Sequence, residues 1–191
     1  VLPTPASGKW YSVTTGTGYA PANVPDKTAD TYVTQLATPI LAPNSTWFNN
    51  DYGITRDSIT EIVIANIYKP TGTAGVDYYV WDASEAKDGS VMVYVEGTKL
   101  TISGNGYGCV YANADSSNVF NGFTNMISFV GANFLDTSRT TTLEKAFYDC
   151  LSLKELDLNS WDTSNVENLR GTFNGMLALE SIAVSNWNTG K

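Results

Sequence analysis

Glu155 and Asp157 are the residues whose types and spacing best suit chemistry. They flank Leu156, so that in a β-strand both carboxylates lie on the same face. Two carboxyl groups placed close together can act as the acid and the base of a glycosidase. A solvated strand face gives the same pattern without any catalysis. We favour the solvated face and expect no enzymatic activity.

The other reactive residue types exclude several kinds of site. The chain has no histidine, which removes His-based triads and His metal sites. Cys109 and Cys150 are too few for a disulfide framework, and the sequence leaves open whether they pair. We interpret Cys150 as an inert interior thiol. Asp157, Asn159 and Asp162 lack the glycine and distal glutamate of an EF-hand, so we predict no metal and no cofactor.

The overall charge excludes two classes of partner. The 191 residues carry 11 basic and 19 acidic side chains, a formal net charge of −8. Nucleic-acid binding and adhesion to anionic membranes both need the opposite sign. No run of about 18 apolar residues is present, so we predict no membrane insertion. A charge-poor β-type composition favours an exported protein, although no signal segment is visible at Val1.

The first part of the chain divides into a lead-in and a cap. Residues 1–46, rich in Thr, Ala, Gly and Pro, indicate an extended lead-in with little helix. Residues 47–114 predict a β-rich cap. Its β-branched run at 58–68 is a strand, 78–82 is another, and 91–102 alternates around a glycine-containing turn like a hairpin.

From about residue 115 onward the sequence repeats itself every 26 residues. The pairs at this spacing are Phe147 and Phe173, Leu153 and Leu179, Leu156 and Ile182, Leu158 and Val184, and Trp161 and Trp187. One period earlier, Ile127, Val130 and Ala132 match Leu153, Leu156 and Leu158. Repetition at one spacing indicates stacked units that bury their apolar faces against one another.

Each unit predicts a strand followed by a short helix. Leu153–Leu158 has the Leu-x-x-Leu-x-Leu pattern of a leucine-rich repeat, and alternation makes its second half a strand. Ser164 and Glu167 have capping-box spacing, and apolar residues recur at helical spacing over 166–173. Units of this kind stack into a sheet of parallel strands with the helices on the other side.

The repeat also predicts which residues share the strand face. The positions equivalent to Glu155 and Asp157 hold Phe129 with Gly131 and Ser181 with Ala183, so the face is mixed and shallow. The candidate ligand-binding residues on this face are Phe129, Glu155, Asp157 and Ser181. Trp161 and Trp187 suit ligand platforms, but their spacing favours filling the same corner of two stacked units.

Residues 147–166 (FYDCLSLKELDLNSWDTSNV) carry a resemblance to a known family, as does the segment 81–92. They resemble the BspA-like leucine-rich-repeat surface proteins, and the likeness covers about residues 81–191. Leu169, Thr172 and Met176 depart from the family pattern of two methionines and a cysteine. The resemblance implies a surface-displayed bacterial protein that works by binding, often in adhesion, and it supplies no catalytic residues.

These observations predict an α+β repeat protein. A β-rich N-terminal cap precedes a leucine-rich-repeat solenoid of about three repeats at 115–191, with parallel strands and short helices. The expected function is adhesion to a protein or glycan at the cell surface. The alternative is a structural subunit of a virion or surface filament, whose partners are copies of itself. The sequence leaves open whether the chain is a piece of a longer array.

Overall fold

The computed structural model describes residues 37–49, 52–106 and 108–188, together with the backbone of three short strands before them. The chain forms two compact units, Val1–Thr38 and Pro39–Lys191. In the first, β1 (Trp10–Ser12) pairs antiparallel with β2 (Gly18–Tyr19) and with β3 (Tyr32–Thr34). The rest of the predicted lead-in before residue 37 lies outside the described residues. Residues 39–46 belong to the second unit.

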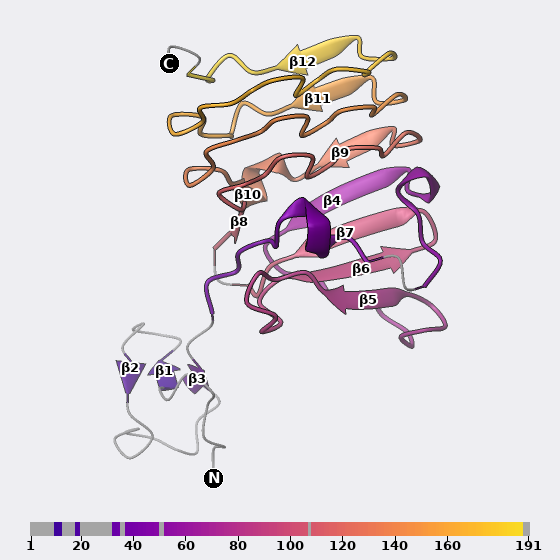
Figure 1. Ribbon diagram of the computed structural model, residues 1–191. Coiled ribbons are helices and arrows are strands. Elements are labelled where there is room, and N and C mark those ends of the chain that lie inside the picture. The colour runs from indigo at the N-terminus through magenta and orange to yellow at the C-terminus, as the bar shows by residue number, and fades with distance from the viewer. Residues whose placement is uncertain are drawn as a thin grey trace. The chain divides into compact units, whose positions relative to one another are not determined.

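A mixed five-stranded sheet organises the second unit, in the order β5-β6-β7-β4-β9 (Figure 1). Its strands are β4 (Glu61–Ala65), β5 (Tyr79–Asp82), β6 (Met92–Glu96), β7 (Lys99–Ser103) and β9 (Ser128–Val130). Strands β5, β6 and β7 are antiparallel, whereas β4 runs parallel to both β7 and β9. The predicted hairpin and both predicted strands of the cap are therefore confirmed.

Alternating apolar side chains place one face of this sheet in the core, and at β7 the opposite face is covered too, since Thr101 and Ser103 are 1% exposed. Ile62 and Ile64 of β4, like Leu100 and Ile102 of β7, are at most 1% exposed, while the residues between them on β4 are half-buried. Strand period places such residues on one side, where burial in the core stabilises the sheet. That core continues without a break into the repeats.

Two short helices fasten the chain preceding the sheet to the first repeat. They are α1 (Asn44–Trp47) and the 3-10 turn η2 (Arg56–Ser58). The Arg56 guanidinium donates a 2.6 Å hydrogen bond to the Asn121 carbonyl. Burial lowers its pKa to about 10, so it stays charged at neutral pH. It lies 5.0–5.6 Å from the centroids of three aromatic rings, those of Trp47, Phe48 and Phe123.

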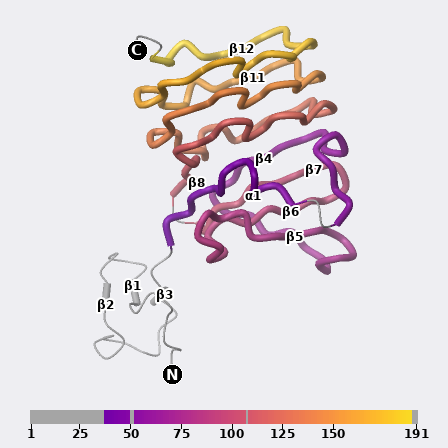
Figure 2. The backbone as a smooth tube through the Cα atoms, viewed as in Figure 1, coloured from indigo at the N-terminus to yellow at the C-terminus, as the bar shows by residue number. Residues whose placement is uncertain are grey.

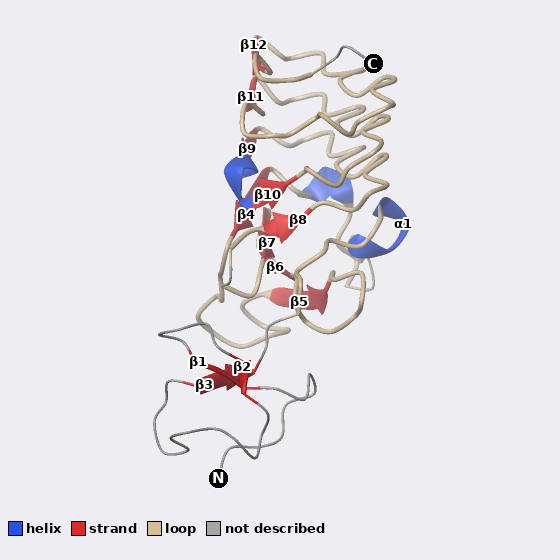
Figure 3. Ribbon diagram, turned by 90° about the vertical axis from the view of Figure 1, so that its left-hand side faces the viewer, coloured by secondary structure: helices blue, strands red, loops and turns tan. Residues whose placement is uncertain are grey.

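The 26-residue units stack on this sheet (Figure 2). Strand β11 (Glu155–Asp157) pairs in parallel with β12 (Ser181–Ala183), with Leu156 opposite Ile182. A second parallel pair joins β8 (Val110–Tyr111) to β10 (Leu135–Asp136). In Figure 3, β9, β11 and β12 lie along one edge of the stack, and loops form the opposite edge.

Within residues 115–188 the predicted helices of the repeats are absent, and the α+β fold class is wrong. Residues 164–175, where a capping box predicted a helix, form turns. The reason is that backbone groups bond between units. The N–H groups of Leu143, Lys145 and Phe147 donate to the carbonyls of Asn168, Arg170 and Thr172 at 2.9–3.0 Å. A backbone group used in this way does not form an i→i−4 bond. The second unit is mostly β, with mixed sheets, so the predicted leucine-rich-repeat solenoid of parallel strands and short helices is wrong.

The described residues contain no helix long and apolar enough to span a membrane.

Candidate functional site

Three of the four predicted strand-face residues lie where the sequence placed them. Glu155 and Asp157 are exposed on the outer face of β11, on either side of the buried Leu156. Ser181 is exposed on β12, directly opposite Glu155. Phe129 is an exception, because its side chain is only 8% exposed and packs edge-on against the rings of Phe120 and Phe147.

Phe129 points inward because the first unit is in a different register from the one predicted. Met126 and Phe129 are buried, whereas Ile127 is 65% and Val130 is 46% exposed. Met126 and Phe129 therefore take the places of Leu153 and Leu156, 27 positions earlier in the sequence. The 26-residue spacing holds again from Ala132, which is equivalent to Leu158. The predicted match of Ile127 and Val130 to those leucines is wrong.

The first unit has one extra residue between Phe129 and Ala132, and Gly131 accommodates it. This glycine has φ +80°, a left-handed conformation that glycine adopts without strain, and the 3-10 turn η3 (Ala132–Phe134) follows it. A Cβ at this position would stand 2.0 Å from the carbonyl oxygen of Ile64. This close approach lets the end of β9 lie against β4, in the five-stranded sheet.

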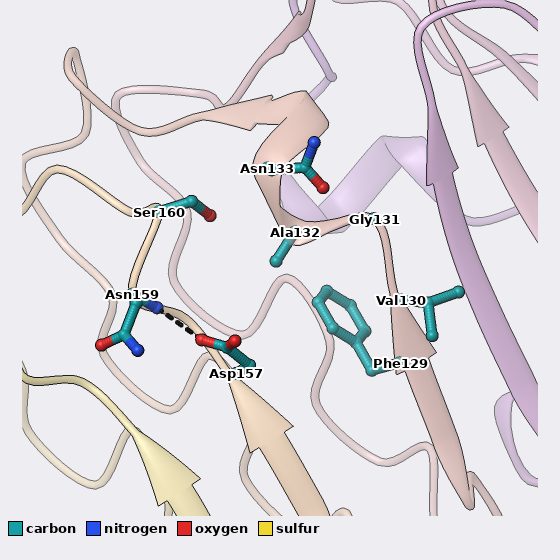
Figure 4. A pocket seen from close by; sticks show the side chains of 8 residues that line it. All are labelled: Phe129, Val130, Gly131, Ala132, Asn133, Asp157, Asn159 and Ser160. Carbon is teal, nitrogen blue, oxygen red and sulfur yellow. Dashed lines mark hydrogen bonds between the residues drawn. The ribbon is translucent and has the colours of Figure 1, made fainter.

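The extra residue interrupts the sheet between the first and second units. Strand β9 belongs to the five-stranded sheet and β11 to a separate pair with β12. A pocket of about 410 Å³ opens between them, which we call the junction pocket (Figure 4). It is lined by Phe129, Val130, Gly131, Ala132, Asn133, Asp157, Asn159 and Ser160.

The junction between the second and third units shows what an uninterrupted stack looks like. There the Asn159 Oδ1 accepts hydrogen bonds of 2.9 Å from the N–H and the hydroxyl of Ser185. Asn186 Nδ2 donates to the Asn159 carbonyl at 3.1 Å. Between the first and second units, Asn133 takes the place of Asn159, and Asn159 takes the place of Ser185. The Asn159 N–H does not donate to Asn133, however. It donates to Asp157 within its own unit, at 3.0 Å.

The polar groups of the junction pocket are therefore left without partners from the neighbouring unit. Among the described residues, the exposed side chains of Asn133 and Ser160 make no hydrogen bond. Asp157 and Phe129 both line the pocket (Figure 4), but the carboxylate is on the exposed face of β11, whereas the Phe129 side chain is only 8% exposed. The exposed polar side chains are available to a ligand.

A buried indole N–H also lacks a hydrogen-bond partner at the junction of the first and second units. Trp187 Nε1 donates to the Leu158 carbonyl of the preceding unit at 3.1 Å. Trp161 takes the same place one unit earlier and is 2% exposed, yet its Nε1 has no acceptor among the described residues. The two indoles stack at 6.4 Å with an interplanar angle of 6°, so they fill one corner of the stack as the spacing predicted.

Neither cysteine takes part in the pocket. Both are free thiols, which answers the open question of a disulfide. Cys150 is buried and donates to the Phe120 carbonyl at 3.2 Å, and burial raises its pKa to about 12. Burial, together with the nearby Asp136 carboxylate, also raises the pKa of the half-buried Cys109.

The two aspartates considered as calcium ligands accept hydrogen bonds from backbone N–H groups. Asp157 and Asp162 each accept a backbone N–H two residues ahead, from Asn159 and Ser164. The bond from Ser164 holds the pKa of Asp162 below its usual value. Within the part of the chain that the structure describes, no group of three or more Asp, Glu, Cys or His side chains is placed to hold a metal ion.

Sequence reasoning missed Asn133 and Ser160 as site residues. The one available signal was that Asn133 and Asn159 stand 26 positions apart, like the structural residues of the repeat. That spacing indicates equivalence in the stack but not that one member of the pair lacks its partner.

A second hollow, which we call the end hollow, lies on the last described unit. It is apolar, has a volume of about 440 Å³, and is lined by Leu169, Gly171, Thr172, Phe173, Asn174, Val184 and Trp187. These positions are equivalent to those that the second unit uses to bind the third. Its apolar side chains are half-buried.

Comparison with known proteins gives one family. Residues 114–191 match the family described as Mycoplasma protein of unknown function, DUF285. Neither a curated protein nor a solved structure matches the chain. The repeat region, which contains the junction pocket, is therefore similar to a family whose function is itself undescribed.

Proposed function

We propose that this protein is a non-enzymatic binding module that recognises a protein or a glycan through the strand face of its stacked units. The junction pocket is the observation that carries the proposal. Its lining includes the exposed side chains of Asp157, Asn133 and Ser160, which are a carboxylate, an amide and a hydroxyl, together with the largely buried Phe129. A few convergent polar groups in an otherwise apolar concavity are typical of ligand sites.

The rest of the strand face extends this surface beyond the pocket. Glu155 and Ser181 are exposed beside each other on β11 and β12, and Lys154 pairs with Glu180 at 3.3 Å at the start of the same strands. An exposed ion pair of this kind contributes little to stability. Its residues are therefore free to exchange partners when a larger ligand binds.

The proposed setting is the surface of a bacterium, or the medium around it. The resemblance of residues 147–166 to BspA-like surface proteins supports this setting, as does a composition poor in charge. The match to an undescribed family adds no function of its own.

A binding screen with matched charge variants tests the proposal. Wild-type protein, Asp157→Lys and Glu167→Lys are each immobilised and exposed to a panel of extracellular matrix proteins, mucins and polysaccharides. Asp157 lies at the pocket, whereas Glu167, which is also exposed, lies in the turn region that follows Ser164. We expect Asp157→Lys to lose at least about tenfold in affinity and Glu167→Lys to bind like the wild type.

Two results would contradict the proposal. One is equal binding by both variants, because the strand face would then not be the site. The other is turnover of a polysaccharide that is abolished in a Glu155→Gln, Asp157→Asn double variant with an unchanged melting temperature.

The end hollow favours a second candidate, a structural subunit that associates with a second copy of itself. Equivalent residues of neighbouring units already stack on each other. The ring centroids of Phe147 and Phe173 are 6.3 Å apart, with an interplanar angle of 21°. An aromatic ring presents the same surface on both sides. Phe173 and Trp187 of two copies can therefore continue the stack across a twofold axis.

The last strand offers the same copy a second contact. Among the described strands, β12 pairs only with β11, and its Ile182 is 37% exposed although the equivalent Leu156 is buried. An edge strand with an apolar side chain is a template for pairing, and a twofold axis pairs two such edges antiparallel. The expected product is a dimer joined by its last repeats.

Sedimentation velocity decides this second candidate. We expect the wild type to dimerise, Ile182→Lys to be a monomer, and Leu177→Lys to dimerise like the wild type. Leu177 is a suitable control because it is 84% exposed in the same unit. A wild type that stays monomeric up to high concentration would eliminate the structural-subunit function.

A further inference from the structure

The turn segment of the last described unit carries a row of backbone N–H groups that have no acceptor among the described residues. They belong to four half-buried residues at alternate positions, Leu169, Gly171, Phe173 and Gly175. The N–H groups between them bond within the unit, as Thr172 does to the Leu169 carbonyl at 3.3 Å and Asn174 to the Gly171 carbonyl at 3.0 Å. The row therefore consists of the groups that bond between units elsewhere in the stack.

The two junctions inside the stack show what such a row binds. In the first unit the N–H groups of Ser116, Asn118, Phe120 and Gly122 donate at 2.8–3.2 Å to the carbonyls of Thr142, Glu144, Ala146 and Tyr148. In the second unit those of Leu143, Lys145, Phe147 and Asp149 donate at 2.9–3.0 Å to the carbonyls of Asn168, Arg170, Thr172 and Asn174. Each junction thus joins four alternate donors of one turn segment to four alternate carbonyl oxygens of the next.

Apolar side chains of the same segment lose their cover at the same place. Leu143 and Phe147 are 1% and 0% exposed in the second unit. The equivalent Leu169 and Phe173 are half-buried and line the end hollow. A partner that covers this surface as the third unit covers the second supplies carbonyl oxygens and an apolar side chain together.

The start of the stack, by contrast, is closed by the cap. The carbonyl oxygens of Val119 and Asn121 stand where the later units accept bonds from the unit before them. Here the Trp47 indole donates to the Val119 carbonyl at 2.9 Å, and the Arg56 guanidinium donates to the Asn121 carbonyl at 2.6 Å. The cap therefore occupies acceptors that a second copy needs for head-to-tail stacking.

The row of N–H groups also distinguishes between other partners. The twofold contact of the second candidate covers the aromatic rings, but it sets donors against donors here and leaves the row to solvent. Sugar hydroxyls have no repeat that matches alternate residues of a backbone. Polypeptide carbonyls have that period, because successive residues of an extended chain point to opposite sides.

We infer that the end of the stack binds a segment of a partner protein that carries the turn sequence of this repeat, with its alternate carbonyl oxygens on the four N–H groups and an aromatic ring on Phe173. When a peptide adds to the edge of a sheet, backbone bonds give affinity and side-chain pockets give specificity. The inference goes beyond the proposed function, because this surface shares no lining residue with the junction pocket.

A synthetic peptide of residues 163–176 (TSNVENLRGTFNGM) is the probe, because this segment already supplies the carbonyl row to the second unit. It is titrated into the full chain, labelled with nitrogen-15 and carrying Ile182→Lys, so that dimerisation does not compete. We expect the amide proton signals of the four free N–H groups to move downfield in a saturable way. A free peptide must become ordered to bind, so the expected dissociation constant is on the order of 100 μM.

Matched controls show whether the sequence and the ring are recognised. The same residues in scrambled order, and the peptide with Phe173→Ala, should each bind at least about tenfold more weakly. In the labelled protein, Phe173→Lys should weaken binding of the unchanged peptide to a similar extent. Leu177→Lys should not, because Leu177 is 84% exposed in the same unit and does not line the end hollow.

The outcomes are distinct from those of the proposed function. Asp157→Lys should bind the peptide as well as its parent does, so a failure of the junction pocket leaves this inference standing. Shifts confined to other amides, equal binding of the scrambled peptide, or no saturable shift at millimolar peptide would each overturn it. Protection of the four N–H groups from exchange in a wild-type dimer would show that the occupant is a second copy, which also overturns it.

Discussion

At the scale of single residues, Gly131 determines where the stack departs from its own repeat. It combines φ +80° with a backbone so close to Ile64 that no side chain fits between them. Trp161, with its unpaired indole N–H, and Asn133, with its unpaired amide, are the neighbouring consequences of that departure among the described residues. The pocket is therefore built by one backbone position more than by any of its side chains.

Gly131→Ala tests that position. A Cβ at 2.0 Å from the Ile64 oxygen forces β9 away from β4, so we expect the free energy of unfolding to fall by at least ~3 kcal/mol. Gly89→Ala is the matched control, because Gly89 also has positive φ but a Cβ there would meet no atom within 4 Å. The control should lose only ~1–2 kcal/mol. Urea denaturation of both variants gives the comparison, and equal losses would show that the contact with Ile64 is unimportant.

The two thiols predict a difference in reactivity. Burial raises the pKa of Cys150 to about 12, whereas Cys109 is only half-buried. At pH 8 we expect a thiol reagent to label Cys109 in the native protein and to label Cys150 only after unfolding. Mass spectrometry of the labelled peptides reads out both sites, and fast native labelling of Cys150 would contradict its burial.

The raised pKa of Cys150 also makes the free energy of unfolding depend on pH in the alkaline range. The ordinary pKa of the thiol is 9.0, and the folded protein holds it near 12, so between these values the folded state binds more protons than the unfolded state. This contribution to stability is complete below about pH 9 and is lost as the pH rises toward 12.

At the scale of elements, backbone pairing between units explains why the repeats contain turns where helices were expected. Lys145 and Asp149 adopt φ of 54° and 57°, and Gly171 and Gly175 adopt φ of 66° and 82°. Left-handed residues at this frequency interrupt any helix. The N–H groups of Lys145 and Asp149 donate instead to carbonyls of the equivalent turn in the next unit, those of Arg170 and Asn174. Periodicity of apolar residues could not reveal this, because a repeated turn buries its side chains at similar spacings.

Leu156 and Ile182 form a matched pair for measuring what stacking contributes. They are paired in register on β11 and β12, but Leu156 is 2% exposed and Ile182 is 37% exposed. We expect Leu156→Ala to cost ~2–5 kcal/mol and Ile182→Ala to cost well under half of that. Urea denaturation again provides the values. Equal costs would mean that a further layer covers Ile182 in solution, and a loss below ~0.5 kcal/mol at Leu156 would mean that its side chain is not buried.

At the scale of the whole second unit, stability is expected to decrease along the stack. The five-stranded sheet and its core support the first repeat, which supports the second and then the third. Each repeat gains most of its stability from its nearest neighbours, so the last one opens at the lowest free energy.

Native-state hydrogen exchange checks that gradient. We expect the protection of backbone amides to be greatest in β4 and β7, lower in β11 and lowest in β12. Ile182→Lys in the same experiment keeps the comparison free of dimer contacts. Equal protection of β12 and β4 would mean that the unit opens only as a whole.

The sequence alone determined the features that depend on local pattern. Alternation of apolar residues predicted the strands around Ile62 and the hairpin that includes Val93, and the 26-residue spacing predicted the stacking of Trp161 on Trp187. Exposure of Glu155 and Asp157 followed from their flanking a buried leucine. Each of these follows from a period of two or from a repeat, both of which are visible in the order of residues.

Only the tertiary structure decided the rest. The direction of backbone hydrogen bonds, within a unit or between units, depends on the neighbours that packing supplies, so the helices could not be excluded in advance. The 27-residue spacing in the first unit depends on Gly131 meeting Ile64, two residues 67 positions apart in the sequence. That contact turned Phe129 inward, separated β9 from β11 and left Asn133 unpaired. The candidate site is thus a product of how one repeat meets the cap, which no repeat considered by itself contains.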